Sequence, residues 1–352
     1  MSDIQKLFCP DCSEVVDAAN PSRHAEHEIT RREFLQKVGK VAVGVAAAPM
    51  IYHAAPLIKR ETSEPAEILV KRLRDRLSDA QKRTILLPWN DSRRLQVNNN
   101  WRVVPQQIDE FYSREQQNLI QEILKAVTSE EGYEKILRAM QDDMGGLGNY
   151  SACLCGNGGD KLAFMLTGRH QTIRADGGAE KHTVFGGPIF YGHAVTFYEK
   201  PDHPGNVWWH QARLASKVYQ ALDGKQQQQA LILRDSPDDS PATIQLQGEQ
   251  GKFSGIPISE LSRDQKELVE AAMRSLLAPY RKSDVDRVMS STKANGSLDK
   301  LHLSFYQDGN LPDKDGIWDR WRLEGPSFVW YFRSSPHVHT RGSMLRTAQT
   351  FS

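Results

Sequence analysis

Residues 162–175 read Leu-Ala-Phe-Met-Leu-Thr-Gly-Arg-His-Gln-Thr-Ile-Arg-Ala, an apolar run that ends in polar and charged residues. Side chains along a strand alternate between its two faces. Leu162, Phe164, Leu166, Gly168 and His170 would therefore share one face. The stretch predicts one continuous strand, with His170 towards its end.

Segments on both sides of this strand also have apolar residues at regular spacing. Apolar residues at helical spacing predict helices over 113–140, with a break near 131–132, and over 206–223 and 259–280. Residues 301–305, 318–323 and 328–332 predict three closing strands, the last reaching 337–340. Helices lie between groups of strands without regular alternation. We therefore expect an α+β fold, with a mixed or largely antiparallel sheet and packed helices in a single large domain.

The composition limits the classes of partner. The chain has 352 residues, 39% of them hydrophobic, and a formal net charge of +1. This balance is that of a globular protein with a sizeable core, and it gives no electrostatic reason to expect nucleic acid as a partner. Past residue 60 the chain has two cysteines, Cys153 and Cys155. Residues two apart form a disulfide only with strain, so we expect two ordinary thiols in a loop, with soft-metal binding as the alternative.

The N-terminal part resembles an export signal. Thr30, Arg31, Arg32, Phe34 and Leu35 have the spacing of a twin-arginine motif, and an apolar stretch over 38–58 follows them. The pattern predicts transport by the twin-arginine translocase into the periplasm or cell envelope, with membrane contact only through this segment if it stays uncleaved. The expected organisation is a polar region at 1–29, the signal at 30–60, a linker at 61–70, the main domain at 71–343 and a tail at 344–352.

The polar region before the signal carries a possible zinc site. Cys9 and Cys12 are followed by His24 and His27, and two thiolates with two imidazoles can complete a tetrahedral zinc site. The two-residue gap between the histidines is shorter than the usual three to five. The alternative is a flexible segment with incidental cysteines and histidines.

No sequence signature of a known catalytic site is present, since the chain has no GxSxG, HExxH, Walker or dinucleotide-binding motif. The placement of histidines is the main chemical signal. His337 and His339 alternate in one strand end, so both rings would face the same side, and His170 and His193 follow other apolar segments. Converging imidazoles would suit a transition metal such as Zn, Cu or Fe. The alternative is that each ring packs singly.

Two further groups of side chains could hold a small-molecule ligand. Arg169 and Arg341 neighbour the histidines, and a guanidinium binds a carboxylate or phosphate in a bidentate manner. Structural ion pairs with Glu324 or Asp176 are the alternative for these arginines. The aromatic set could form a ligand platform, although core packing explains most of its members: Tyr191, Trp208, Trp209, Trp318, Trp321, Trp330 and Tyr331.

The order of several short motifs resembles the family catalogued as domain of unknown function 3500, over roughly residues 71–343. The motifs are Gly168-Arg169-His170, Gly187-Pro188-Ile189-Phe190, Leu222-Asp223-Gly224-Lys225-Gln226, Gly255-Ile256-Pro257 with Leu261-Ser262-Arg263-Asp264-Gln265, Gly325-Pro326-Ser327-Phe328, and His337-Val338-His339. The chain departs from the family pattern at Arg169, where a histidine is usual, and at Arg341-Gly342-Ser343, where an aromatic residue and Arg-Asp are usual. The resemblance implies the architecture and the histidine set, and no reaction.

Two functional hypotheses follow, and the sequence leaves open whether the protein is an enzyme. The first is an exported metal-dependent enzyme with a histidine-rich site built from His170, His193, His337 and His339. The second is a non-catalytic periplasmic or envelope protein that binds a small ligand.

Overall fold

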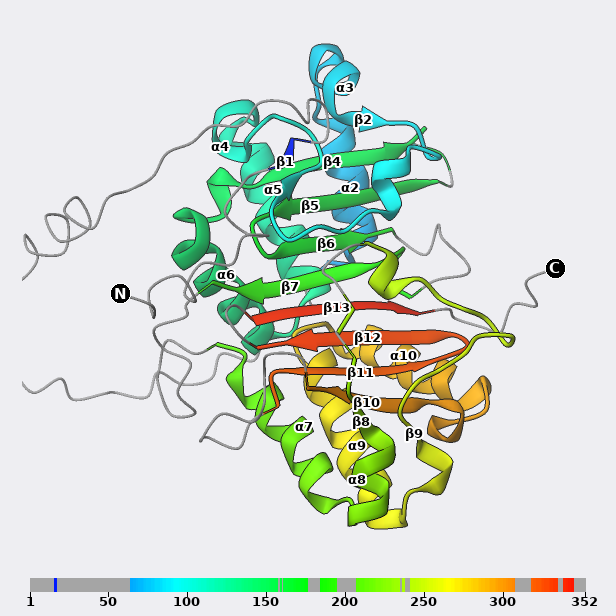
Figure 1. Cartoon of the computed structure of the whole chain (residues 1–352). Coiled ribbons are helices and arrows are strands. Elements are labelled where there is room, and N and C mark those ends of the chain that lie inside the picture. Colours follow the sequence, from blue (N-terminus) through cyan, green and yellow to red (C-terminus); the bar gives the residue numbers. More distant parts are fainter. Residues whose placement is uncertain are drawn as a thin grey trace, which may run out of the picture. The chain divides into compact units, whose positions relative to one another are not determined.

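The computed structural model of the protein describes residues 16–17, 64–157, 159, 161–176, 184–194, 207–234, 236–237, 241–307, 318–334 and 338–344 (Figure 1). All of them belong to one compact unit. The predicted twin-arginine signal, the predicted zinc ligands Cys9, Cys12, His24 and His27, and the predicted metal ligand His337 lie outside the described residues.

Five of the described helices begin after a residue whose side chain caps them. The four residues that complete capping boxes are Ser78, Ser113, Asp223 and Ser262. The described helices are α2 (Ala66–Asp75), α3 (Asp79–Ile85), α4 (Ile108–Phe111), α5 (Arg114–Val127), α6 (Glu130–Met144), α7 (Trp209–Ala221), α8 (Gly224–Ala230), α9 (Arg263–Leu277) and α10 (Lys282–Ala294). No described helix is long and apolar enough to span a bilayer.

One mixed sheet organises the described residues. Its strands are β2 (Leu86–Leu87), β4 (Ser151–Gly156), β5 (Leu162–Gly168), β6 (Gln171–Ala175), β7 (Ile189–His193), β8 (Leu231–Ile232), β9 (Ile256–Pro257), β10 (His302–Tyr306), β11 (Arg320–Gly325), β12 (Phe328–Arg333) and β13 (Val338–Met344). The order is β2-β4-β5-β6-β7-β13-β12-β11-β10-β8, with β9 beside β10. The β2–β4 and β8–β10 pairs are parallel, and the others are antiparallel. The expected α+β architecture is confirmed.

The two faces of the sheet have different coverings. Helices α2, α5, α9 and α10 lie on one face, which we call the helical face (Figure 1). Tyr191 points to this face and donates a hydrogen bond to the carbonyl of Leu276 in α9. The opposite face is covered at β5 and β6 by the segment around η3 (Ser92–Leu95) and β3 (Trp101–Arg102), where Trp101 donates to Thr172. We call it the polar face. Strand β3 also pairs with β1 (Val16–Asp17).

The structure corrects three element predictions. Residues 162–175 form a hairpin, β5 and β6, because the chain reverses at Arg169-His170, where His170 has a φ of 58°. Residues 328–340 divide in the same way into β12 and the start of β13. The segment with Cys153 and Cys155 is the inside of strand β4 and not a loop, and both thiols are buried and free.

The helix predictions needed smaller changes. The predicted helix over 113–140 is α5 followed by α6, and the break falls at Thr128-Ser129, because the Ser129 hydroxyl caps α6. Helix α10 had no counterpart in the sequence-based prediction, since its outward residues are polar along most of its length. The predicted helix over 259–280 is α9, and it begins after Ser262, whose side chain caps it.

Candidate functional site

The last turn of α6 carries two consecutive carboxylates, Asp142 and Asp143. Gly145 ends the helix in the left-handed conformation that favours glycine. A carboxylate at the C-terminal end of a helix faces the negative end of the helix dipole, which is electrostatically unfavourable. The two negative charges at this helix end therefore need favourable contacts with other groups. Each of them contacts a histidine from the sheet.

His170 is the second of the two residues that connect β5 to β6. Its φ of 58° lies in the left-handed region, which costs a non-glycine residue about 1–2 kcal/mol. The backbone N–H of His170 donates to the carbonyl of Asn99 at 2.7 Å, which holds the turn in place. Backbone strain of this kind concentrates at functional sites, where the surroundings enforce it.

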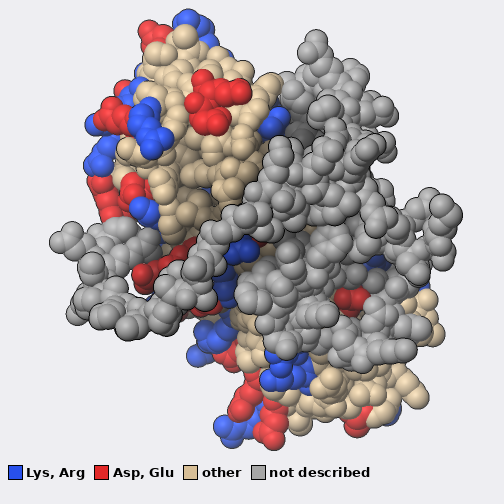
Figure 2. All heavy atoms as spheres, turned by 90° about the vertical axis from the view of Figure 1, so that its left-hand side faces the viewer, with Lys and Arg blue, Asp and Glu red and all other residues tan. Residues whose placement is uncertain are grey.

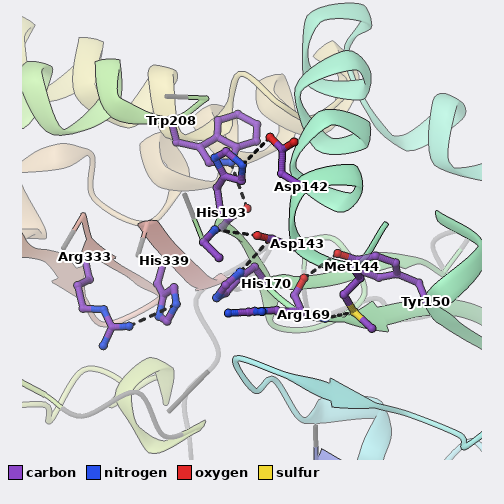
Figure 3. A network of polar contacts seen from close by, with 12 residues as sticks. Asp142, Asp143, Met144, Tyr150, Arg169, His170, His193, Trp208, Arg333 and His339 are labelled. Atoms are coloured by element: carbon purple, nitrogen blue, oxygen red, sulfur yellow. Dashed lines mark hydrogen bonds and ion pairs between the residues drawn. The ribbon is translucent and has the colours of Figure 1, made fainter. Parts of the chain in front are cut away.

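The turn brings the ring of His170 against Asp143. His170 Nδ1 lies 2.8 Å from Asp143 Oδ2, and both side chains are fully buried (Figure 3). The second carboxylate oxygen, Oδ1, accepts the backbone N–H of Ala194 at 2.8 Å. Burial raises the pKa of Asp143 from 3.8 to about 7, while the nearby His193, the Ala194 N–H and Arg169 counteract that shift. A carboxylate held in this way orients the imidazole and stabilises its protonated form.

A second histidine–aspartate pair lies beside the first. His193 ends β7, and its Nε2 lies 3.1 Å from Oδ2 of Asp142 (Figure 3). Asp142 also forms an ion pair with Arg138 at 2.7 Å, and its side chain is 25% exposed. Burial lowers the pKa of His193, although both aspartates oppose that shift. His193 is therefore mainly neutral at pH 7, and its carboxylate partner fixes the orientation of its ring.

His339 completes the group of histidines from strand β13. Its ring centroid lies 4.9 Å from that of His170 and 5.4 Å from that of Phe190. His339 Nε2 lies 3.3 Å from Nη2 of Arg333 (Figure 3). A guanidinium only donates hydrogen bonds, so this contact requires an unprotonated Nε2 that accepts. The contact with Arg333 therefore helps to fix the orientation of the His339 ring.

Two glycines make this close packing possible. A Cβ on Gly192 would lie 2.2 Å from the Val338 carbonyl oxygen and 3.3 Å from the His170 Cβ. A Cβ on Gly168 would lie 2.2 Å from the ring of Tyr150. Tyr150 in turn donates to the carbonyl of Arg169 at 2.9 Å and supports the turn. The glycines near the predicted histidines are thus needed because a side chain at either position would clash with the neighbouring atoms.

The structure brings two of the four predicted metal ligands together, since the rings of His170 and His339 are 4.9 Å apart. His193 lies opposite Val338 in the strand register, points to the other face of the sheet than His339 and contacts Asp142. His170, His193 and His339 come from the ends of β5, β7 and β13, which lie at the same end of the sheet. Among the described residues, no group of three or more histidine, cysteine or acidic side chains has the geometry of a metal site. The two aspartates were missed in the sequence-based analysis. Their position one residue before Gly145-Gly146, separated from it by Met144 at a helix end that disfavours carboxylates, is the signal that could have identified them.

The predicted arginines have different surroundings. Arg169 is half-buried at the hairpin turn, close enough to lower the pKa of Asp143. Arg341 is fully buried on β13, and its guanidinium lies 5.0 Å from the ring centroid of Phe190. Glu324, considered as a partner for these arginines, forms its ion pair with Arg322 at 2.6 Å. The predicted aromatic platform is part of the protein interior, because all seven of its rings are buried.

The fold and this site define an α+β protein with paired histidines and aspartates at one end of a large mixed sheet. The chain belongs to the family described as "Protein of unknown function (DUF3500)", whose sequence profile matches residues 59–349. No curated protein matches the sequence. No solved structure matches it either.

Proposed function

We propose that the protein is an enzyme that carries out acid–base chemistry on a small molecule, with His170 as the proton-transferring group. The buried 2.8 Å contact between His170 Nδ1 and Asp143 Oδ2 carries this proposal. Asp143 fixes the tautomer, so the other ring nitrogen, Nε2, exchanges a proton with the substrate. General acid–base catalysis of this kind contributes about 10²–10⁴ to a rate.

The neighbouring side chains support this assignment. Burial lowers the pKa of His193, and the guanidinium of Arg333 lies beside His339, so the surroundings of both rings disfavour their protonation. Arg169 stands next to the pair and supplies positive charge for an anionic group on the substrate. The strained backbone at His170 supports a functional role, because a merely structural turn at this position would favour glycine.

A screen of small-molecule substrates with the purified protein tests the proposal. For any activity found, we expect His170→Asn and Asp143→Asn each to lower kcat by at least about 100-fold while the protein still folds, as shown by a cooperative melting transition. Asparagine tolerates the left-handed backbone at position 170, so loss of activity there reports on the imidazole and not on the turn. Full activity in His170→Asn would refute the proposal. Ligand binding without turnover of any compound would favour the non-catalytic small-ligand-binding protein.

A metal-dependent enzyme is the second candidate, and one observation favours it. His170 and His193 each bind a carboxylate through one ring nitrogen, which is the arrangement in which metal-bound histidines are usually held. His170, His193, His339 and the predicted ligand His337 would then bind Zn, Cu or Fe. Elemental analysis of the purified protein distinguishes the two candidates. Stoichiometric metal that disappears in His170→Asn and His339→Asn would support the metal enzyme, and metal-free active protein would exclude it.

The predicted site of action is the periplasm or cell envelope, and the predicted partner for reaching it is the twin-arginine translocase. The support is the pattern Thr30-Arg31-Arg32 with Phe34 and Leu35, followed by the apolar stretch at 38–58. This route carries folded proteins. Transport of the folded chain would preserve the buried contacts between α6 and the sheet that form the site.

A further inference from the structure

Three sulfur atoms meet on the polar face of the sheet, at a distance along the strands from the histidine site. Cys153 and Cys155 are two residues apart in strand β4, so their side chains point to the same face. Met165 lies directly opposite Cys153 on the neighbouring strand β5 (Figure 1). Directly opposed residues of antiparallel strands share a face and have Cβ atoms about 4.5–5.5 Å apart. The strand register therefore places two thiols and one thioether side by side.

The sulfur atoms of these three residues are in contact. The thiol of Cys155 lies 3.9 Å from the thioether sulfur of Met165. The thiols of Cys153 and Cys155 are hydrogen-bonded to each other. Cys155 therefore contacts both of the other sulfurs, and the three atoms form one group, which we call the sulfur cluster.

The sulfur cluster is buried, and its cysteines are reduced. Cys153 is 1% exposed, and Cys155 and Met165 are 0% exposed. Both cysteines are free thiols. A disulfide between residues two apart in a strand forms only with strain. The two thiols are therefore held close together in a position where bonding to each other is unfavourable and bonding to a shared ion is not.

The spacing of the sulfurs fits an ion bound between them. A metal–thiolate bond is about 2.3 Å long, the value known for zinc. Three sulfurs at this distance from a central ion, at the corners of a triangle, lie about 4 Å from one another. The 3.9 Å between Cys155 and Met165 is close to that value. The ion would occupy the space between the sulfurs once the thiol protons have left, so no separate cavity is required.

The kind of ligand indicates which ion the sulfur cluster would bind. Thiolate and thioether sulfurs are soft ligands, and Cu(I) is the soft ion that binds both. Structural zinc sites take four ligands in a tetrahedron, from thiolate, imidazole and carboxylate groups. The thioether of Met165 is not one of these groups. A set of two cysteines and one methionine therefore favours Cu(I) over zinc.

The charges around the sulfur cluster suit the complex that would form. Two thiolates and one Cu(I) ion together carry a single net negative charge. The positive charges of Arg93 and Arg174 both act on Cys153, and Arg174 also acts on Cys155. Asp91 has the opposite effect on Cys155, but it is itself paired with Arg93 at 2.7 Å. The surrounding guanidinium groups therefore stabilise an anionic copper–thiolate complex inside the protein.

The interior position separates the sulfur cluster from weak binding of copper at the surface. Figure 2 shows acidic and basic side chains interspersed over the described part of the surface in view. Carboxylates of this kind are hard ligands that suit Mg, Ca or Mn. An ion on the sulfur cluster would be held by sulfur alone, so competition with a strong Cu(I) chelator distinguishes it from copper at the surface.

We propose that Cys153, Cys155 and Met165 bind one Cu(I) ion through their three sulfur atoms. Both cysteines bind as thiolates, so two protons pass to the solvent as two copper–thiolate bonds form, and the oxidation state of the metal does not change. Met165 adds the third bond through its thioether. The inference does not depend on the proposed function, because none of these residues belongs to the histidine–aspartate pairs.

Copper binding by the full-length protein tests the inference. Cys9 and Cys12 are the other two cysteines of the chain, so serine replaces both of them in the reference protein. Cu(I) is supplied without oxygen, to the folded protein and during refolding, in competition with a coloured chelator. We expect one ion per chain, with copper–sulfur distances of about 2.3 Å in X-ray absorption spectra. Failure to retain copper under both conditions would overturn the inference.

Matched variants locate the ion. Cys153→Ala and Cys155→Ala should each abolish chelator-resistant binding. Met165→Leu keeps the volume of the side chain and should weaken binding by at least about ten-fold, a loss usual even for groups that only support a metal ligand. Met273→Leu replaces an equally buried methionine of α9 and should leave the affinity unchanged. Equal affinity in the reference protein and Met165→Leu would remove the thioether from the site and refute the inference.

Two further measurements separate the sulfur cluster from the histidine site. His170→Asn should retain Cu(I), whereas loss of copper in this variant together with full binding in Cys155→Ala would place the ion at the histidines and refute the inference. Excess zinc should not displace the copper, and displacement would refute the selection of Cu(I). Turnover that depends on His170 in copper-free Cys155→Ala would leave the proposed function intact whatever the fate of this site.

Discussion

The conformation of one residue, His170, determines how the candidate site is assembled. Its backbone has a φ of 58°, its N–H donates to Asn99, and its ring contacts Asp143. Glycine or alanine at this position would lose the contact with Asp143. Glycine adopts this backbone without the steric cost that a Cβ brings.

Replacing His170 by glycine and by alanine separates the backbone from the ring. Both substitutions remove the imidazole, and only alanine retains the cost of the left-handed backbone, about 1–2 kcal/mol. We therefore expect His170→Gly to be more stable than His170→Ala by about 1 kcal/mol, the reverse of the usual order of the two residues in regular structure. Urea denaturation of the two variants measures the difference. An alanine variant as stable as the glycine variant would show that the turn relaxes without the histidine.

Asp143 makes the stability of the protein depend on pH in a predictable direction. Burial raises its pKa from 3.8 to about 7, so between these values the folded state binds a proton that the unfolded state has released. The contribution of Asp143 to stability is therefore greatest below pH 3.8, falls as the pH rises, and levels off above about pH 7. The loss is about 1.4 kcal/mol for each unit of pKa shift.

Asp143→Asn tests this dependence. The amide does not ionise, so the free energy of unfolding of the variant should fall less between pH 4 and pH 7 than that of the native protein. These two pH values lie near the ordinary and the shifted pKa of Asp143. Groups that do not interact with Asp143 contribute equally to both proteins and cancel in the difference. The pKa of His193 falls further without the charge of Asp143, which changes the difference in the same direction. The measurement is the free energy of unfolding by urea across this pH range. Parallel curves for the two proteins would mean that Asp143 ionises normally in the fold.

At the scale of helices, one contact joins α6 to the C-terminal end of α9. Gly132, in the first turn of α6, is so close to Pro279 that an added Cβ would lie 2.1 Å from the Pro279 carbonyl oxygen. Ser129, which caps α6, also donates through its hydroxyl to the carbonyl of Ala278 at 2.7 Å. The start of α6 is thus fixed to a second helix, and its far end carries Asp142 and Asp143 to the sheet.

Gly132→Ala and Gly224→Ala are a matched pair for this contact. Both glycines lie in the first turn of a helix, but a Cβ on Gly224 would meet nothing within 4 Å. We expect Gly132→Ala to lose about 1–3 kcal/mol from overpacking and Gly224→Ala to gain up to about 1 kcal/mol from reduced freedom of the unfolded chain. Chemical denaturation gives both values. A stabilised Gly132→Ala would show that α6 can move away from α9 at little cost.

The elements predicted correctly from the sequence are those whose signals lie within their own residues. Helix α9 has an apolar stripe and a capping serine, Ser262, within its own sequence. The turn at Arg169-His170 could not be predicted in this way, because neither residue is a usual turn former and the reversal depends on Asn99 and Tyr150, which are distant in sequence. Strand alternation singled out His337 and His339, and positions after apolar segments singled out His170 and His193. Their carboxylate partners come from another element, so only the fold reveals the pairs.

For the whole molecule, the predicted export route has a direct test. Replacing both Arg31 and Arg32 by lysine keeps the charge and removes the arginine pair that the pattern requires. We expect the full chain with both substitutions to remain in the cytoplasm, while the native chain and an Arg23→Lys control reach the periplasm or envelope. Cell fractionation with immunoblotting gives the distribution. Normal export of the double variant would exclude the twin-arginine translocase as the partner.

The order of the strands has a consequence for how the protein behaves when it is concentrated. The sheet ends at β2 on one side and at β8 and β9 on the other, and each of these is only two residues long. A long open edge strand would offer a row of unpaired N–H and C=O groups to another chain. Among the described strands, the long ones all have neighbours on both sides, so the sheet gives a second molecule little backbone to pair with. Amyloid-like stacking from the folded state is therefore disfavoured by the strand order itself.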